Sequence, residues 1–284
     1  MAHFARNPSW IDSRLLQEKT LEEIPESFFE EVKKGLGALE SNNPIVSVVI
    51  PAFNEEASLL KTLWSLSKNK TTYPVEIIVV NNNSTDRTQE VLDRVGVRSF
   101  FQPVQGWGPA RQMGLEKARG KYILSADADC IYPERWIQKM TDALLKDGVV
   151  CVHGGYRFLA PYGKSRLSLF AYETIKGIIV EIRNIKRPWF NCGGASMGYP
   201  KDLALKIGFV LRQVRGEDGR MAFELAQRGK LVRVRSSEVT VWTSARSLQR
   251  DGSLMRSFLN RVKTESGRLR SYLRKQEVHD THLS

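Results

Sequence analysis

The sequence predicts an α/β fold in which a mainly parallel central sheet is covered by helices on both faces. Short runs that are mostly apolar and rich in β-branched residues alternate with helical patterns between residues 45 and 125. Such runs are typical of parallel strands, because both faces of these strands are buried. Polar clusters follow the carboxyl ends of three runs, and open α/β sheets bind ligands at that edge.

The elements follow one another in a regular order along the chain. The segment 20–40 predicts one or two short amphipathic helices that end near Gly35 and Gly37. The alternating part then predicts strands at 45–54, 75–81, 97–103 and 122–125, with helices at 55–69, 86–95 and 108–120. Beyond residue 150 we expect a strand at 151–158, long or capped helices at 167–186 and 216–230, and one or two strands at 231–243.

The stretch "YILSADADC" places two aspartates at the end of a buried strand. Asp127 and Asp129 leave the same side of an extended segment because side chains alternate along a strand. Two carboxylates so close raise each other's pKa unless a cation lies between them. Few, hard oxygen ligands suit Mg²⁺ or Mn²⁺ whose other positions are filled by water and phosphate. The pair therefore predicts a metal–nucleotide site, and the alternative is a solvated loop with a capping aspartate.

Charge and cysteine content narrow the class of protein. The chain has 43 Lys and Arg against 31 Asp and Glu, and the net charge of +12 favours anionic partners. Aromatic residues are not interleaved with the basic ones as in RNA-binding platforms, so we expect no nucleic-acid partner. The three cysteines are far apart and without CxxC spacing, which argues against disulfides and zinc and favours a reducing compartment.

Four segments taken together resemble a known enzyme family. In order they are "VSVVIPAFNEEASLLKTLWSL", "VEIIVVNNNSTDRTQEV", "GPARQMGLEKARGKYILSADADC" and "GEDGRMAFEL". Their order and spacing, from about Val46 to Thr243, resemble family 2 glycosyltransferases of the GT-A type. The resemblance implies a Rossmann-like GT-A domain at 45–245, preceded by a helical extension at 1–44 and followed by a basic helical tail at 246–284.

The resemblance also implies the reaction and the residues that carry it. Such enzymes use a nucleotide-diphosphate sugar, and most invert the anomeric centre. A divalent metal stabilises the charge on the leaving diphosphate, and a general base on the opposite face activates the acceptor hydroxyl. The implied donor-binding residues are Pro51, Ala52, Phe53, Glu55, Asn81, Asn83, Arg111, Asp127 and Ala128. Asp129 and Asp127 would hold Mg²⁺ or Mn²⁺, Gly193 and Gly194 would bind the acceptor, and Asp218, next to Glu217, would be the catalytic base.

The expected partners follow from the same resemblance. They are a UDP- or GDP-sugar donor and a carbohydrate or lipid-linked acceptor. No signal peptide is visible, so we expect a cytoplasmic protein, with peripheral contact of the basic tail with the anionic inner face of the cytoplasmic membrane. Two alternatives stay open. One is a phosphohydrolase of the HAD type, which also places DxD after a strand, and the other is a non-enzymatic basic protein of the membrane surface.

Overall fold

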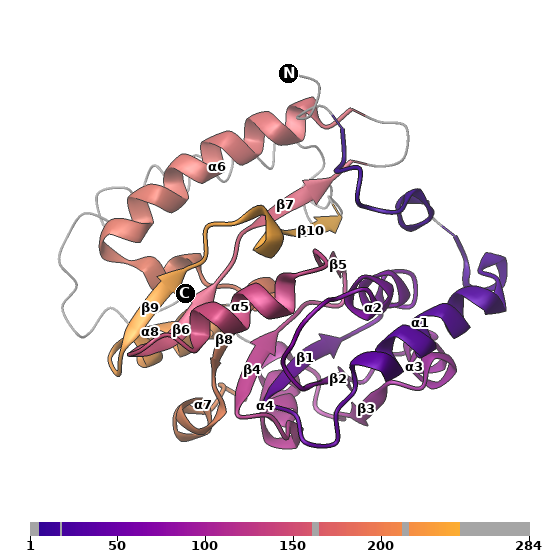
Figure 1. Cartoon of the computed structure of the whole chain (residues 1–284), viewed down its shortest axis with the longest axis horizontal. Coiled ribbons are helices and arrows are strands. Elements are labelled where there is room, and N and C mark those ends of the chain that lie inside the picture. Colours follow the sequence, from indigo (N-terminus) through magenta and orange to yellow (C-terminus); the bar gives the residue numbers. More distant parts are fainter. Residues whose placement is uncertain (1–5, 18, 161–164, 212–215, 245–284) are drawn as a thin grey trace. The chain divides into compact units, whose positions relative to one another are not determined.

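The computed structural model describes residues 6–17, 19–160, 165–211 and 216–244. Its centre is a seven-stranded sheet with the order β3-β2-β1-β4-β8-β6-β9 (Figure 1). The strands are β1 (Val46–Ala52), β2 (Val75–Asn81), β3 (Arg98–Phe101), β4 (Tyr122–Ser125), β6 (Val149–His153), β8 (Met197–Pro200) and β9 (Lys230–Arg233). Only β8 runs antiparallel to its neighbours β4 and β6, so the predicted mainly parallel sheet is confirmed.

The first strand shows how the sheet accommodates a proline near the site. β1 lies between β2 and β4, and its pairing with β4 ends at Val49. The carbonyl of Val49 accepts from Ala126, whereas that of Ala52 accepts from Asn82 beyond β2. Backbone groups of a parallel strand alternate between its two neighbours, so the nitrogen of Pro51 faces the side on which β4 has already ended. The missing N–H of Pro51 therefore leaves the ladder intact.

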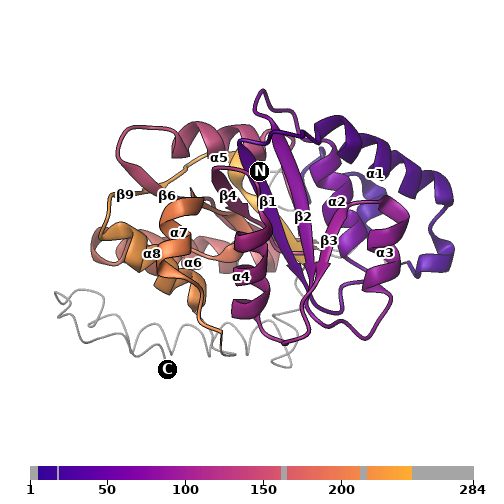
Figure 2. The same cartoon turned by 90° about the horizontal axis from the view of Figure 1, so that it is seen from below.

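Helices cover both faces of this sheet, as predicted. The helices are α1 (Glu26–Leu39), α2 (Leu59–Ser67), α3 (Thr88–Val95), α4 (Trp107–Lys117), α5 (Trp136–Leu144), α7 (Lys201–Ile207) and α8 (Glu217–Ala226). Right-handed crossovers place α2 and α3 on one face and α4 on the other, because the chain reverses its direction across the sheet after β3 (Figure 2). Gly114 lets α4 approach closely, since a Cβ there would lie 2.3 Å from Val49 Cγ1.

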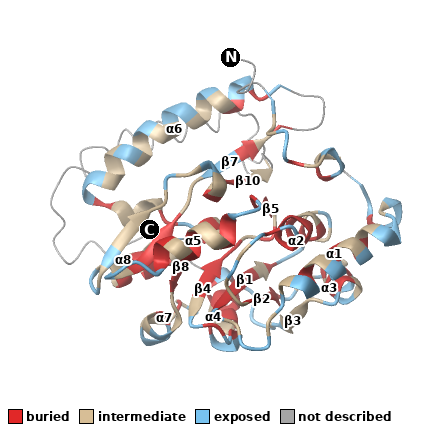
Figure 3. Ribbon diagram, in the orientation of Figure 1, coloured by how far each residue is buried: buried red, intermediate tan, exposed pale blue. Residues whose placement is uncertain are grey.

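The helix α1 is longer than the sequence suggested. It continues through Gly35 and Gly37 to Leu39, so the expected end near these glycines was wrong. The reason is packing: a Cβ on Gly35 would lie 2.8 Å from Ser67 Cβ, and the glycine allows α1 to lie directly against α2. Gly37 has open space around it. Figure 3 shows exposed residues on the outer side of α1, whereas central strands such as β1, β2 and β4 are mostly buried.

The contacts within the chain group its residues into two units. The larger unit, Glu18–Tyr156 with Cys192–Val241, contains the sheet, the helices above and the short strand β5 (Cys130–Ile131). The described residues also form five 3-10 helices. Three lie in the larger unit, at Leu21–Glu23, Gly194–Ser196 and Ser237–Val239, and two lie in the smaller unit, at Ser13–Leu16 and Pro188–Asn191. The domain boundaries expected from the sequence stay predictions, and the expected basic tail at 246–284 lies outside the described residues.

The smaller unit is made of Met1–Gln17, Arg157–Asn191 and Trp242–Ser284. It contains the long helix α6 (Leu167–Lys186), as predicted, and the neighbouring strands β7 (Tyr156–Leu159) and β10 (Val241–Ser244) begin at its borders. Buried Arg166 forms two hydrogen bonds with Glu173, at 2.7 and 2.8 Å. Phe158, Ala160 and Leu169 form a small core. None of the helices within the described residues is long and apolar enough to span a bilayer.

Buried His153 on β6 predicts a pH-dependent stability. Its Nδ1 lies 3.2 Å from the carbonyl of Gly154, and its Nε2 has no hydrogen-bond partner among the described residues. Burial, followed by the charge of Arg233, lowers the pKa of His153 from 6.5 to about 4. Between pH 6.5 and pH 4, His153 is therefore protonated in the unfolded chain but largely neutral in the folded chain. The free energy of unfolding falls as the pH drops through this range.

When the pH is lowered from 7 to 5, we expect the free energy of unfolding of the wild type to fall by about 2 kcal/mol more than that of His153→Phe. Urea unfolding of both proteins at the two pH values measures this difference. The slope between pH values is compared rather than the absolute stability, because phenylalanine also loses the contact with Gly154. An identical pH dependence in the two proteins would show that His153 is protonated in the folded state as readily as in the unfolded one.

Candidate active site

The carboxyl ends of β1, β2 and β4 meet at one edge of the sheet. These strands are parallel neighbours, so the loops that begin at Ala52, Asn81 and Ser125 leave on the same side. The loops are the three polar clusters singled out in the sequence. The structure thus brings together segments that are 25 or more residues apart, as the alternation of strands and helices predicted.

Asp127 and Asp129 converge as the sequence predicted. One carboxylate oxygen from each, together with Cys130 Sγ, lie within 4.8 Å of one another. Both aspartates are partly exposed, whereas Cys130 is buried. Two carboxylates with room for further ligands fit Mg²⁺ or Mn²⁺ held partly by substrate oxygens, whereas a buried thiol is a poor ligand for either ion.

Two buried hydroxyl groups hold the loop that carries these aspartates. The Tyr132 hydroxyl accepts from the backbone N–H of Asp127 at 2.8 Å and donates to the carbonyl of Ala195 at 3.0 Å. On α2, Thr62 Oγ1 lies 2.8 Å from the carbonyl oxygens of both Ala128 and Cys130. The carboxylates are therefore presented by a backbone that is fixed on two sides. Sequence reasoning missed both hydroxyls, since no local pattern indicates that either contacts the loop after β4.

Arg111, on α4, lies underneath the acidic groups. Its side chain is only 6% exposed. Nη2 lies 3.3 Å from Asp127 Oδ1, while Nε lies 3.2 Å from Asp218 Oδ1 and 3.5 Å from Glu217 Oε1. Burial lowers the pKa of Arg111, but Asp218, Asp127 and Glu217 together raise it above its ordinary value. One buried cation thus joins the acidic pair after β4 to the acidic pair at the start of α8.

Two of the carboxyl groups around Arg111 have raised pKa values in spite of its positive charge. Burial, then the charges of Asp129 and Asp218, raise the pKa of Asp127 to about 7 against the lowering effect of Arg111. Burial and the charge of Asp218 likewise raise the pKa of Glu217. The buried guanidinium therefore does not fully compensate the acidic groups. A divalent cation at Asp127 and Asp129 would favour their ionised forms.

Asp218 occupies the first turn of α8. The helix follows Gly216, whose φ of 91° is in the left-handed region. Asp218 Oδ2 accepts from the backbone N–H of Gly194 at 2.9 Å, and its side chain is mostly buried. Helix N-termini favour negative charge, so the position of Glu217 and Asp218 also suits the helix dipole. Asp218 is thus held by one backbone donor and one cation.

The two glycines expected to bind the acceptor have different surroundings. A Cβ on Gly194 would lie 1.9 Å from Arg111 Nη2, so only glycine leaves room for the guanidinium. No heavy atom of the described residues lies within 4 Å of a Cβ built on Gly193. The absence of a side chain at 194 is therefore explained by Arg111. Acceptor binding by either glycine stays a prediction.

The loops after β1 and β2 are connected by several hydrogen bonds. The Asn54 backbone N–H donates to Ser84 Oγ at 3.0 Å, and Thr85 donates to Asn54 Oδ1 at 2.8 Å. Asn83 has a φ of 59°, which confirms that this position requires a residue that tolerates positive φ. The interlocked loops give a rigid rim next to the acidic residues.

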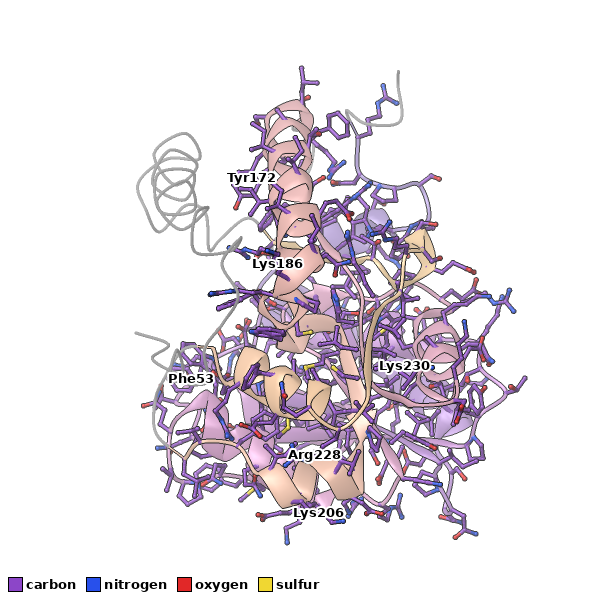
Figure 4. All side chains as sticks on the ribbon, turned by 90° about the vertical axis from the view of Figure 1, so that its left-hand side faces the viewer. Phe53, Tyr172, Lys186, Lys206, Arg228 and Lys230 are labelled. Atoms are coloured by element: carbon purple, nitrogen blue, oxygen red, sulfur yellow. The ribbon has the colours of Figure 1, made fainter. Side chains whose placement is uncertain are left out.

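The residues expected to bind the nucleotide include both exposed and buried side chains. Phe53, which follows β1 and is labelled in Figure 4, is 41% exposed, whereas Ala52 is buried. Asn81 is 2% exposed. Its Oδ1 accepts from Ser84 N–H at 3.0 Å, and its Nδ2 donates to Gln89 Oε1 at 2.8 Å. In this structure the Asn81 amide stabilises the loop, and its contact with a base stays a prediction.

A family sequence model with the description "Glycosyl transferase family 2" matches residues 47–208. The chain belongs to glycosyl transferase family 2. The resemblance stated from the sequence motifs is thereby confirmed. The matched region includes Asp127, Asp129, Arg111 and Gly194, whereas Glu217 and Asp218 lie beyond it. This family assignment supports neither the phosphohydrolase nor the non-enzymatic alternative.

Curated relatives of this chain are described as glycosyltransferases. An uncharacterized glycosyltransferase of Haemophilus influenzae is 32% identical over 123 residues, which are 41% of this chain and 49% of that protein. Glycosyltransferase AglE of Haloferax volcanii is 30% identical over 134 residues, or 44% of this chain and 43% of that protein. The chain therefore spans about half the length of these curated relatives or less.

Solved structures confirm the GT-A fold. A mannosyltransferase of Pyrobaculum calidifontis in complex with GDP-Man and Mn²⁺ has a TM-score of 0.57 at 17% identity, over 86% of this chain and 76% of that one. Glucosyl-3-phosphoglycerate synthase of Mycobacterium tuberculosis, with Mn²⁺, UDP-glucose and phosphoglyceric acid, has a TM-score of 0.55 at 21% identity, over 88% of both chains. At these identities the likeness concerns the fold of this family 2 chain.

Proposed function

We propose that this family 2 chain is an inverting, metal-dependent glycosyltransferase. It moves a sugar from a nucleotide-diphosphate donor to a hydroxyl group of the acceptor. The observation that carries the proposal is the convergence of Asp127, Asp129 and Asp218 around Arg111 at the carboxyl edge of the sheet. That arrangement supplies one acidic pair for a cation and a separate carboxylate for a proton.

The donor side is formed by the loops after β1, β2 and β4. Asp129 and Asp127 would hold Mg²⁺ or Mn²⁺, which supplies electrostatic stabilisation of the departing diphosphate. The interlocked loops around Asn54 and Ser84 would position the nucleoside. Two structures with the same fold carry Mn²⁺ with GDP-Man or with UDP-glucose, which supports a UDP- or GDP-sugar donor here.

Asp218 is the proposed general base. Its carboxylate takes the proton of the acceptor hydroxyl as the hydroxyl oxygen bonds to the anomeric carbon. The bond from that carbon to the diphosphate oxygen breaks at the same time, and the electron pair leaves with the nucleoside diphosphate. Attack opposite the leaving group inverts the anomeric centre. The Gly194 N–H and Arg111 orient the base, and Arg111 is a positioning residue because it is buried under the carboxylates.

The acceptor is proposed to be a carbohydrate or a lipid-linked glycan. The net charge of +12 supports a protein that works beside anionic lipid in the cytoplasm, at the inner face of the cytoplasmic membrane. Nothing in the site requires nucleic acid, so none is included among the proposed partners.

Thermal stabilisation by UDP, GDP, TDP, CMP and ADP, each with and without Mn²⁺, tests the donor site. We expect one diphosphate to raise Tm by about 5–10 °C at a hundredfold excess over its Kd, and only with the metal. Asp129→Ala should abolish this shift, because it removes half of the metal-binding pair. Asp202→Ala, at an exposed acid on α7, is the control and should keep it.

Two results would contradict the proposal. One is a full Mn²⁺-dependent shift in Asp129→Ala. The other is robust hydrolysis of p-nitrophenyl phosphate by the wild-type protein that Asp127→Ala removes, since this would favour the phosphohydrolase alternative.

A further inference from the structure

Helix α6 of the smaller unit carries a row of exposed aliphatic side chains. Leu167, Ile175, Ile178 and Ile185 are 64%, 39%, 58% and 72% exposed. Among the residues of this helix, only Leu169 is buried. Isoleucine and leucine are among the residues most often buried in proteins. Single exposed examples are common, but a contiguous row marks an interaction surface.

These four residues lie on one side of the helix. At 3.6 residues per turn, positions 167, 175, 178 and 185 fall within about 80° of one another, and Ala171 and Ile182 share the same sector. The row extends over about 27 Å, because each residue adds 1.5 Å. We call this set of six residues the α6 stripe.

The opposite side of α6 is fixed by the core of its own unit. Leu169 packs with Phe158 and Ala160, and Tyr172 lies against this cluster. Glu173 pairs with buried Arg166, whose guanidinium lies 4.7 Å from the Trp242 ring centroid. Figure 4 shows Tyr172 and Lys186 projecting from the helix. The side of α6 that carries Leu169 and Glu173 is thus packed against its own unit, which leaves the α6 stripe on the opposite side of the helix.

Charge decides which partner fits the stripe. Apart from the buried residues Arg166 and Arg187 and the Glu173 carboxylate paired with Arg166, the helix carries three basic side chains, Lys176, Arg183 and Lys186, against one acidic side chain, Glu181. The whole chain has a net charge of +12. A second copy of the chain would bring a like charge to the stripe. The segment 246–284 would do the same, because it contains nine Lys and Arg against four Asp and Glu. An anionic lipid surface offers apolar burial and opposite charge together.

We propose that α6 is an interfacial helix that binds anionic lipid bilayers through the α6 stripe. The aliphatic side chains enter the boundary between headgroups and acyl chains, while basic residues such as Lys186 remain at headgroup level. The stripe shares no residue with the proposed donor site, and it gives a structural basis for the membrane location proposed above. A lipid-linked acceptor would then be met at the membrane, which is the part that rests on the proposed function.

Flotation of the full chain with vesicles tests the proposal. We expect binding to vesicles of phosphatidylcholine with phosphatidylglycerol and much weaker binding to phosphatidylcholine alone. Ile178→Asp should lower the partition coefficient at least tenfold, because it places a charge in the middle of the stripe. Leu211→Asp is the matched control, since Leu211 is 64% exposed but belongs to the other unit, and it should bind as the wild type does.

Three outcomes would overturn the proposal. The first is equal flotation of Ile178→Asp and the wild type. The second is a lipid-free wild-type oligomer that Ile178→Asp converts to monomers, because the stripe would then join copies of the chain. The third is a large fall in Tm for Ile178→Asp but not for Leu211→Asp, which would mean that the chain itself covers the stripe.

The Mn²⁺-dependent nucleotide shift separates this proposal from the proposed function. Ile178→Asp should keep that shift in full. Loss of flotation with an intact nucleotide shift supports the membrane surface alone. A wild-type protein that floats but shows no nucleotide shift would instead contradict the transferase proposal and leave the lipid-binding surface supported.

Discussion

Replacing Asp218 by asparagine is expected to lower kcat by about 10²–10⁴-fold, which is the usual contribution of a general base. The asparagine side chain is nearly isosteric and its oxygen can still accept from the Gly194 N–H, so the geometry is kept. The amide cannot take the proton of the acceptor hydroxyl. Donor affinity and the Mn²⁺-dependent nucleotide shift should stay close to those of the wild type.

Glu217→Gln is the matched control for this experiment. Glu217 lies one residue away on the same helix turn, is buried and also faces Arg111. We expect Glu217→Gln to lower kcat by less than tenfold. The role of Glu217 is to compensate the guanidinium charge, and its carboxylate lies further from Arg111 Nε than that of Asp218 does. Initial rates at saturating donor compare the two variants. If Asp218→Asn retained at least a tenth of wild-type kcat while Glu217→Gln did not, the base would have to be Glu217.

Replacing Arg111 by methionine is expected to reduce the free energy of unfolding by about 3–5 kcal/mol at pH 7, because it leaves buried carboxylates without their cation. Asp218 and Glu217 lose a partner at 3.2 and 3.5 Å, and Asp127 loses one at 3.3 Å. Methionine fills much of the space of the arginine stem, so the loss reports mainly charge. Urea unfolding followed by circular dichroism measures it.

The pH dependence of this variant distinguishes charge from packing. Burial and Asp218 already raise the pKa of Glu217, and without Arg111 the pKa rises further. A raised carboxyl pKa means that the folded state binds the proton more readily than the unfolded state. Lowering the pH from 7 to 5 should therefore restore part of the lost stability. A loss that is the same at both pH values would indicate a packing defect instead.

Arg111→Lys provides a graded comparison. Lysine keeps the positive charge but has no planar fork with which to reach Asp127 and Asp218 together. We expect a smaller stability loss than in the methionine variant, together with a clear loss of kcat, because the two acidic pairs are no longer aligned. A lysine variant with wild-type kcat would show that charge alone is sufficient.

The sequence predicted the parts of the molecule that depend on local patterns. Largely apolar runs predicted β1, β2 and β4, because strands that are buried on both faces are mostly apolar. The pair Asp127 and Asp129 could be recognised because two closely spaced carboxylates after a buried strand suit a divalent cation. The structure forms a turn at Ala128 and Asp129 and not the extended segment that was expected. The order of the motifs indicated the family, and no structure was needed for that step.

Long-range packing explains what the sequence did not predict. Arg111 was expected to bind the donor, which stays a prediction, and the structure adds its contacts with acidic groups from a distant segment. Asn81 was likewise expected to bind the donor, and the structure adds the contacts of its amide with Ser84 and Gln89. Thr62 and Tyr132 hold the loop that carries Asp127 and Asp129, which no motif indicated. Each of these depends on contacts that no short pattern records.

The hydrogen bond from the Gly194 N–H to Asp218 can form only late in folding. Gly194 stands just before β8. Among the described strands of the main sheet, β8 alone is antiparallel, and it lies between β4 and β6. The Asp218 carboxylate receives its backbone donor only after this late segment has docked. A nascent chain that has formed β1 to β4 would therefore possess the proposed cation ligands before the proposed base is ordered. The proposed sugar transfer would begin only once the long-range contacts of the C-terminal half are complete.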